Sequence, residues 1–312
     1  MKIIRPVVVD DYVLDVSNIT ENDYAAYSGA TTYALGDRVI STATHRIYES
    51  LQSANTNNAL PVSPETITEW WQDIGATNRW KMFDGVVESQ SSNADSIQVV
   101  MTPGRIDSLA LLNIDAQNYR ITLDAEPGSP SNRVYDSGTV LLEDMQTVGD
   151  WYEYFFEPLP IRKSDVVLTD IPPYTDGILT VTLSAPLATV KIGLLVVGLN
   201  RAIGDTQWKP NVGIVDYSLK TTDSFGNTSV TERTFTKRMT VDVIVQNHLI
   251  DYIIRVLSDY RATAVVWVGD HDPEDDRAVF TSMIIFGFFK SFDVVIDSPA
   301  GSICAIEIEG LA

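Results

Sequence analysis

Side chains that bind metals or act as nucleophiles are few in this sequence and do not cluster. The three histidines have no second histidine beside them at metal-ligand spacing: His45, His248 and His271. The single cysteine, Cys304, lies in an apolar run in which strand alternation places it on one face with Ile306 and Ile308. We therefore expect a small buried hydrophobe there rather than a reactive thiol, and we predict no catalytic set, no zinc site and no cofactor.

The densest group of carboxylates is the segment Asp270 to Asp276. Carboxylates at alternating positions can converge on calcium, and the candidate ligands are Asp270, Asp272 and Glu274. The segment departs from the EF-hand pattern, because Asp275 takes the place of the turn glycine and Thr281 that of the bidentate glutamate. A solvated acidic hairpin tip is the simpler interpretation, so no metal site is predicted.

A second group of carboxylates flanks an aromatic segment. Asp150, Glu153 and Glu157 surround the aromatic residues of the run Trp151 to Phe156. A pair of carboxylates can hydrolyse a glycosidic bond, but sequence spacing does not give the separation between the two carboxyl groups. We predict one strand over Tyr152 to Phe156, with its acidic side chains facing water.

Aromatic residues form the most informative pattern in the chain. In order, it comprises Tyr27, Tyr33, Gly36, Asp37, Val39, Tyr48, Pro61, Trp70 and Trp71. A module this small cannot leave all its large aromatic side chains exposed, so we expect Tyr33, Tyr48 and Trp70 to form its core. Neighbours in a strand point to opposite faces, which makes Trp71 the outward residue and the better ligand candidate.

This order of residues resembles the small chitin-binding modules classed as carbohydrate-binding families five and twelve. Those modules read Trp-x5-Tyr-x2-Gly-Asp-x-Val, followed by Tyr, Pro and Trp. Tyr27 stands here in place of the first Trp, and the segment between Val39 and Tyr48 is longer. The resemblance implies a small β module whose exposed aromatic faces stack on pyranose rings. The candidate carbohydrate-binding residues are Tyr27, Tyr48, Trp70 and Trp71.

Short apolar runs bounded by Gly, Pro, Asn or Asp predict many strands in the rest of the chain. They include Ile97 to Met101, Tyr119 to Leu123, Ile178 to Leu183 and Val190 to Val197. Alternation from Phe235 to Val245 is typical of a half-buried strand. Asn247 to Tyr260 is the one convincing helix, because its apolar residues recur at steps of three and four behind Asn247 as a cap. We expect this amphipathic helix to pack on a C-terminal sheet.

Clusters of turn residues divide the chain and predict a mainly β protein of several parts. The predicted regions are an N-terminal strand segment (1–21), a carbohydrate-binding-module-like domain (22–83), a β-sandwich domain (84–204) and a C-terminal β-rich α+β assembly domain (205–312).

The charge balance and the apolar runs restrict the partners. The chain has 22 Lys and Arg against 42 Asp and Glu, a net charge of -20 that repels nucleic-acid backbones. The longest apolar run, Ile192 to Leu199, is far shorter than the roughly 20 residues of a membrane-spanning helix. Asp10, Asp11 and Asp15 stand where a secretory signal would continue its apolar core. We therefore expect no nucleic-acid partner, no membrane span and no export signal.

The segment that follows the aromatic module carries a second resemblance. It reads Gly75-Ala76-Thr77-Asn78-Arg79-Trp80-Lys81-Met82-Phe83-Asp84 and enters a β-rich region, which is similar to structural proteins of tailed bacteriophages and prophages. Ile106 to Ile114 and Val190 to Gly204 resemble the jelly-roll, galactose-binding-like sandwiches of such virion proteins. Residues 213–227 and 306–311 resemble phage tail-tip chains.

Together the resemblances imply a non-enzymatic structural protein of a phage tail, at the distal tail, tail tip or baseplate. Such a protein is made in the host cytoplasm, is located in the virion, forms a homo-oligomeric ring with other tail proteins as partners, and contacts host surface glycans. The alternatives are a free carbohydrate-binding protein and a tail-associated glycan depolymerase. The depolymerase would need two carboxylates in one groove.

Overall fold

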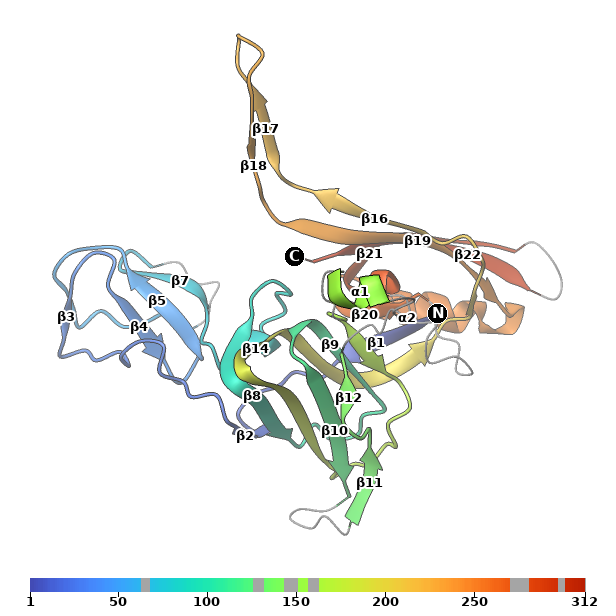
Figure 1. Cartoon of the computed structure of the whole chain (residues 1–312), viewed down its shortest axis with the longest axis horizontal. Helices are drawn as coiled ribbons and strands as arrows, with labels where there is room; N and C mark the ends of the chain where they lie inside the picture. The colour runs from blue at the N-terminus through green and yellow to red at the C-terminus, as the bar shows by residue number, and fades with distance from the viewer. Residues whose placement is uncertain are drawn as a thin grey trace.

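The computed structural model describes residues 1–62, 68–125, 132–142, 151–156, 163–269, 281–296 and 301–311. It is mainly β, as predicted: three bodies of antiparallel strands are joined into one chain, with short helices at their margins (Figure 1). Within the described residues, no helix has the length and apolar character needed to cross a bilayer.

The aromatic module is a small body of five short strands beside the rest of the molecule (Figure 1). Its strands are β3 (Thr32–Tyr33), β4 (Arg38–Ser41), β5 (Arg46–Ser50), β6 (Asn55–Thr56) and β7 (Trp71–Ala76). The strands β4, β5 and β7 form one antiparallel sheet, and β3 pairs with β6. Among the described residues of the module, one buried cluster comprises Tyr33, Val39, Tyr48 and Trp71.

The central region is a β sandwich built around one long strand, β14. Its strands are β2 (Leu14–Ser17), β8 (Ser91–Met101), β9 (Ser108–Asp115), β10 (Asn118–Asp124), β11 (Arg133–Asp136), β12 (Val140–Leu141), β13 (Val166–Leu168) and β14 (Ile178–Ala202). The first half of β14 pairs with β10 and the second half with β9, while β8 follows both halves across a register shift between Ser184 and Thr189. The two predicted strands of this segment are therefore one.

The N-terminal strand joins the central sandwich to the C-terminal region. β1 (Lys2–Pro6) pairs with β14 on one side and with β20 (Val265–Val268) on the other. Gly198 permits this pairing, because a Cβ there would overlap the backbone carbonyl of Arg5. β1 thus joins the two regions into one continuous sheet, which comprises fifteen strands within the described residues.

The C-terminal region continues this sheet in the order β20, β21, β22, β19, β15. Its other strands are β15 (Asp205–Thr206), β16 (Asn211–Asp216), β19 (Phe235–Val245), β21 (Ile284–Val295) and β22 (Ser302–Gly310), with 3-10 turns at Asn247–Leu249 and Thr281–Met283. A further 3-10 turn, Lys81–Phe83, lies between β7 and β8. β19 has the predicted bounds, and Cys304 in β22 is fully buried with Ile306 and Ile308, as expected.

The predicted C-terminal helix is confirmed as α2 (Ile250–Asp259), and it packs on the sheet. Ile253 and Leu257 are buried in one cluster with Val241 and Val243 of β19. The predicted cap is wrong: Asn247 lies in the 3-10 turn before the helix, and its Oδ1 accepts a hydrogen bond from Ser302 Oγ at 2.6 Å.

The strand predicted over Tyr152 to Phe156 is wrong, because this segment is the short helix α1 (Trp151–Phe156). The rings of Trp151 and Phe155 stack with centroids 6.3 Å apart, a contact that the four-residue spacing of a helix brings about. Asp150 and Glu157 lie outside the described residues, as does the side chain of Glu153.

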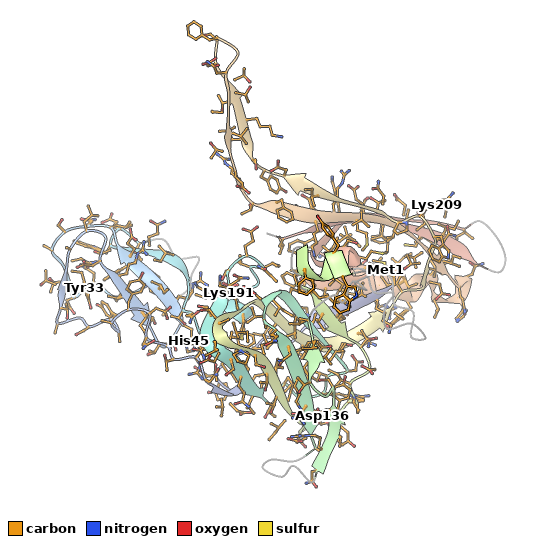
Figure 2. All side chains as sticks on the ribbon, in the orientation of Figure 1. Met1, Tyr33, His45, Asp136, Lys191 and Lys209 are labelled. Atoms are coloured by element: carbon orange, nitrogen blue, oxygen red, sulfur yellow. The ribbon has the colours of Figure 1, made fainter. Side chains whose placement is uncertain are left out.

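A two-stranded hairpin projects from the C-terminal sheet. We call β17 (Leu219–Thr222), β18 (Thr228–Thr231) and the turn between them the arm. It continues the direction of β16 and β19 away from the sheet, and its side chains stand clear of the rest of the chain (Figures 1 and 2). All residues of its two strands are exposed.

Candidate functional site

The aromatic residues of the module pack against each other rather than against solvent. The rings of Tyr27 and Tyr33 stack at 6.0 Å, and the Trp71 ring meets both edge-on at 5.8 and 5.2 Å. Trp71 Nε1 donates to the backbone carbonyl of Asn58 at 2.9 Å. This is the geometry of a small aromatic core, in which each polar atom of a ring reaches a backbone partner.

The expectation that Trp71 faces outward is therefore wrong, since its side chain is only 1% exposed. Trp71 begins β7 and points into the core, whereas Trp70 precedes the strand, is half-buried and packs against the same cluster.

Of the other candidates, Tyr48 is buried and Tyr27 is half-buried. Tyr48 Oη lies 3.1 Å from Thr44 Oγ1, and Tyr27 Oη donates to the carbonyl of Asn58 at 2.8 Å. Burial raises the pKa of Tyr27, with a smaller contribution from Tyr33. Tyr33 and Tyr48 belong to the core as predicted, so only Tyr27 and Trp70 of the four candidate residues reach the surface.

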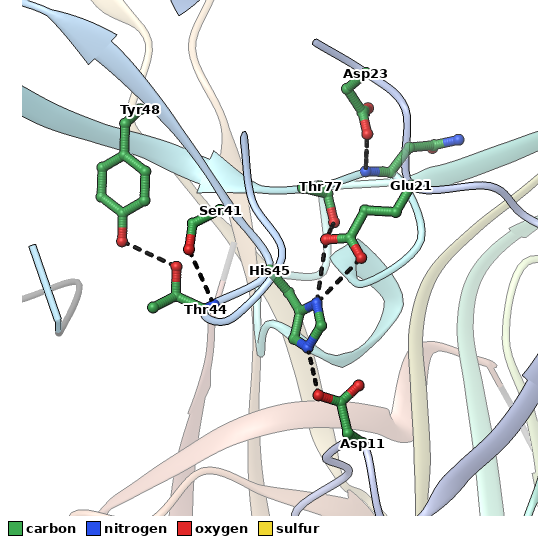
Figure 3. A network of polar contacts seen from close by, with 9 residues as sticks. Asp11, Glu21, Asp23, Ser41, Thr44, His45, Tyr48 and Thr77 are labelled. Atoms are coloured by element: carbon green, nitrogen blue, oxygen red, sulfur yellow. Dashed lines mark hydrogen bonds and ion pairs between the residues drawn. The ribbon is translucent and has the colours of Figure 1, made fainter. Parts of the chain in front are cut away.

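A polar network around His45 fixes the module to the chain that surrounds it (Figure 3). His45 Nδ1 lies 3.1 Å from both carboxylate oxygens of Glu21, and Nε2 lies 3.1 Å from Asp11 Oδ2. Thr77 Oγ1 donates to Glu21 Oε1 at 3.0 Å. The imidazole also stacks on the Trp80 ring at 4.1 Å. Four separate stretches of chain therefore meet at this one side chain.

Trp80 and Met82, which the predicted bounds 22–83 include, belong to one buried cluster with residues of the central sandwich. Their packing sets the module directly against the sandwich. It also brings the segment 81–89 alongside β4, β5 and β7.

Between the module and this segment lies a groove of about 600 Å³, which we call the junction groove. Its lining residues are Asp23, Tyr24, Arg38, Arg46, Ile47, Ile74, Gly75, Ala76, Lys81, Asp84, Val86 and Ser89. Gly75 widens the groove, because it has no side chain and no atom lies within 4 Å of the position that a Cβ would take. Its φ of +138° lies in a region of backbone conformation that favours glycine.

The arginines of the junction groove are held in place by carboxylates. Arg38 Nε donates to Glu49 Oε2 at 2.9 Å, and Arg38 Nη1 donates to Tyr24 Oη at 3.2 Å. Arg46 Nε donates to Asp73 Oδ2 at 2.5 Å. Each pairing orients a planar guanidinium whose remaining N–H groups can serve a ligand.

The groove carboxylate Asp84 is held by two neutral donors. The Val86 N–H donates to Asp84 Oδ1 at 2.8 Å, and Ser89 Oγ donates to Asp84 Oδ2 at 2.7 Å. Burial raises the pKa of Asp84, although both hydrogen bonds and the charges of Arg46 and Lys81 act in the opposite direction.

A second groove, of about 400 Å³, lies at the base of the arm. Its apolar lining includes Leu112, Phe286 and Leu311. Beside them, Lys237 Nζ donates to the buried carboxylate of Asp165 at 2.5 Å, which ties the C-terminal sheet to the central sandwich.

No group of His, Cys, Asp and Glu suited to hold a metal ion occurs in the described part of the chain. The calcium candidates Asp270, Asp272 and Glu274 lie outside it. Cys304 is fully buried, and its burial raises the pKa of the thiol to about 11, with Asp293 and Asp242 adding to the shift.

The groove residues were missed by sequence reasoning, although one signal was present. Three of the six basic residues among residues 1–83 line the groove: Arg38, Arg46 and Lys81. They are separated in the sequence and are brought together only by strand pairing and by the packing of Trp80.

Comparison with known proteins gives little. No protein-family model and no curated protein matches the chain. Among solved structures, a fucolectin from the serum of striped bass (Morone saxatilis) aligns over 76% of this chain and 92% of that chain. The identity is 11% and the TM-score 0.25, a likeness too distant to carry a functional argument.

Proposed function

We propose that this chain is a structural protein of a bacteriophage tail, of the distal-tail, tail-tip or baseplate type. It acts by assembly and binding rather than by catalysis. In this proposal, copies associate with each other as a ring and with other tail proteins in the virion, and the aromatic module faces outward toward glycans of the host surface.

The arm is the observation that carries this proposal. Its apolar side chains are exposed, among them Leu219, Val230 and, at the tip, Phe225, which is 89% exposed. A two-stranded hairpin is marginally stable by itself in water, because neither face is covered. A partner surface that covers the arm would stabilise it, as assembly requires.

The continuous sheet supports the same proposal. β1 is hydrogen-bonded to both β14 and β20. The C-terminal sheet that bears the arm and the central sandwich are therefore parts of one hydrogen-bonded sheet. The module lies away from the arm and is free to contact a different partner (Figure 1).

The test is the mass of the purified full chain by light scattering, with ring-shaped particles sought by negative-stain microscopy. We expect oligomers whose population increases with salt, because salt screens repulsion between copies with a net charge of -20. A chain that stays monomeric at high concentration, at high salt and with neighbouring tail proteins present would contradict the proposal.

A free carbohydrate-binding protein is the second candidate, and the junction groove favours it. A chain that stays monomeric in the test above and binds glycans in calorimetry would support this alternative over the structural one.

A further inference from the structure

We propose that the junction groove, rather than the aromatic core of the module, binds a neutral saccharide. The inference rests on the proposed function, since it assigns the glycan contact of the module to particular side chains. It moves that contact from Tyr48 and Trp71, which are buried, to residues that meet between the module and the segment 81–89.

The groove offers both kinds of hydrogen-bonding group that a polyhydroxylated ring needs. Each sugar hydroxyl donates one hydrogen bond and accepts others. Arg38 uses two of its five N–H groups in the contacts above, and the ammonium of Lys81 lies on the same groove. These groups can donate to hydroxyl oxygens.

The carboxylates that line the groove, Asp23 and Asp84, supply the acceptors. Both oxygens of Asp84 already accept one hydrogen bond each, as do both oxygens of Asp23 from the Asn78 N–H, at 3.1 and 3.2 Å. A carboxylate has about four lone-pair sites, so each group can accept further bonds from hydroxyls.

Apolar surface for the C–H face of a pyranose is present at the same place. Tyr24, Ile74 and Val86 all line the groove, and Tyr24 is 39% exposed. The Tyr24 ring is also held, because Arg38 Cζ lies 5.9 Å from its centroid and Arg38 donates to its hydroxyl. A fixed ring loses little conformational freedom when a ligand packs on it.

The charges of the groove favour a neutral saccharide over an acidic one. Its three cations are accompanied by four carboxylates, the two lining residues Asp23 and Asp84 and the two arginine partners Glu49 and Asp73. The sum is one negative charge, on a chain whose net charge is -20. A uronic acid would therefore meet repulsion both in the groove and at a distance.

The experiment is titration calorimetry of the full chain with two sets of soluble probes. The neutral set comprises oligomers of N-acetylglucosamine, glucose and mannose, and the acidic set comprises oligogalacturonates. We expect binding of at least one neutral probe and none of the acidic probes. Binding confined to the acidic probes, or no binding of any probe, overturns the proposal.

Variants then locate the site. We expect Tyr24→Ala and Lys81→Gln each to weaken binding by about tenfold or more, the effect of one lost contact to a charged or aromatic group. Tyr12→Ala is the matched control, because Tyr12 is 92% exposed and lies outside the groove. It should bind as the parent does, and circular dichroism should show all three variants folded.

Loss of binding in Trp70→Ala with retention in Tyr24→Ala and Lys81→Gln would also overturn the proposal, since it would place the ligand at Trp70, which does not line the junction groove. Light scattering on the same samples separates this failure from failure of the assembly proposal, because the groove residues are not part of the arm.

Discussion

Two carboxyl groups of this protein have pKa values shifted in opposite directions. Burial raises the pKa of Asp84 in the junction groove. Asp136 instead has its pKa lowered to about 2, mainly by its hydrogen bonds to Arg120, whose Nε and Nη2 donate to Oδ1 and Oδ2 at 3.0 and 2.6 Å. The shifts predict opposite effects of neutralising the two residues.

Asp84→Asn should not lower the stability at about pH 7, and it should raise it if the groove otherwise stays unchanged. A raised folded pKa means that the folded state holds its proton more tightly than the unfolded chain, so stability falls as pH rises above the ordinary value. Asparagine avoids this loss and can keep both partners, accepting from Val86 N–H and donating to Ser89 Oγ. The difference from the parent should shrink as pH falls toward about 3.

Asp136→Asn should have the opposite effect and serves as the matched comparison. A depressed folded pKa contributes stability that is present above the ordinary value and is lost as pH falls through about 2. This variant should therefore be less stable than the parent at about pH 7 and equal to it at the acid end. Urea unfolding across the pH range measures both variants, and changes of the same sign would contradict the assignment.

Cys304 gives a separate test at the residue scale. Its thiol is fully buried and its pKa is raised to about 11, so the reactive thiolate is rare and shielded at about pH 8. A thiol reagent should label the folded chain only as fast as it unfolds, and the chain in concentrated urea at once. Rapid labelling of the folded chain would show that β22 is open to solvent.

Among the elements, α2 carries the sharpest prediction. Ile253→Asp places a carboxylate in the buried cluster between the helix and β19, and it should cost about 3 kcal/mol or more of unfolding free energy. Ile254→Asp is the control, because this neighbour faces solvent and is 40% exposed. Thermal and urea unfolding of both variants measure the difference, and equal stabilities would mean that the helix does not pack through Ile253.

Elements whose signal is local could be predicted from the sequence. The alternation in Phe235–Val245 and the three- and four-residue steps of α2 lie within single segments, and both elements occur as expected. Segment Trp151–Phe156 has no such periodic signal, and its aromatic composition favoured a strand where the chain forms a helix.

Features that depend on distant pairing could not be predicted. Ile3 of β1 pairs with Arg201 and Trp267, and no pattern within residues 1–21 indicates either partner. Whether Trp70 or Trp71 points into the core depends on where β7 begins, and that start is set by the pairing of Trp71 with Ser50. The junction groove was missed for the same reason, because its residues come from separate segments that only the folded chain brings together.

At the scale of the whole molecule, the arm and the module lie on different sides of the central sandwich (Figure 1). Asp136 lies at the end of the sandwich far from the arm (Figure 2). Assembly through the arm and glycan contact through the module therefore use different residues, so a variant can lose one of these functions and keep the other.

The arm can be shortened without disturbing the sheet that bears it. Asp216 pairs with Phe235, Tyr217 N donates to the Thr234 carbonyl at 3.2 Å, and Arg233 N donates to Ser218 Oγ at 3.1 Å. Replacing residues 219–232 by Asn-Gly closes this ladder with a two-residue turn of the kind that hairpins favour. The shortened chain should keep the stability and circular dichroism of the parent, since all arm strand residues are exposed.

The most direct test of assembly through the arm is the mass of the full and shortened chains, measured by sedimentation velocity at matched concentration and high salt. We predict that the full chain, whose monomer mass is 34.5 kDa, sediments as an oligomer and that the shortened chain sediments as a monomer. Equal oligomers for both chains, or monomers for both, would contradict the account.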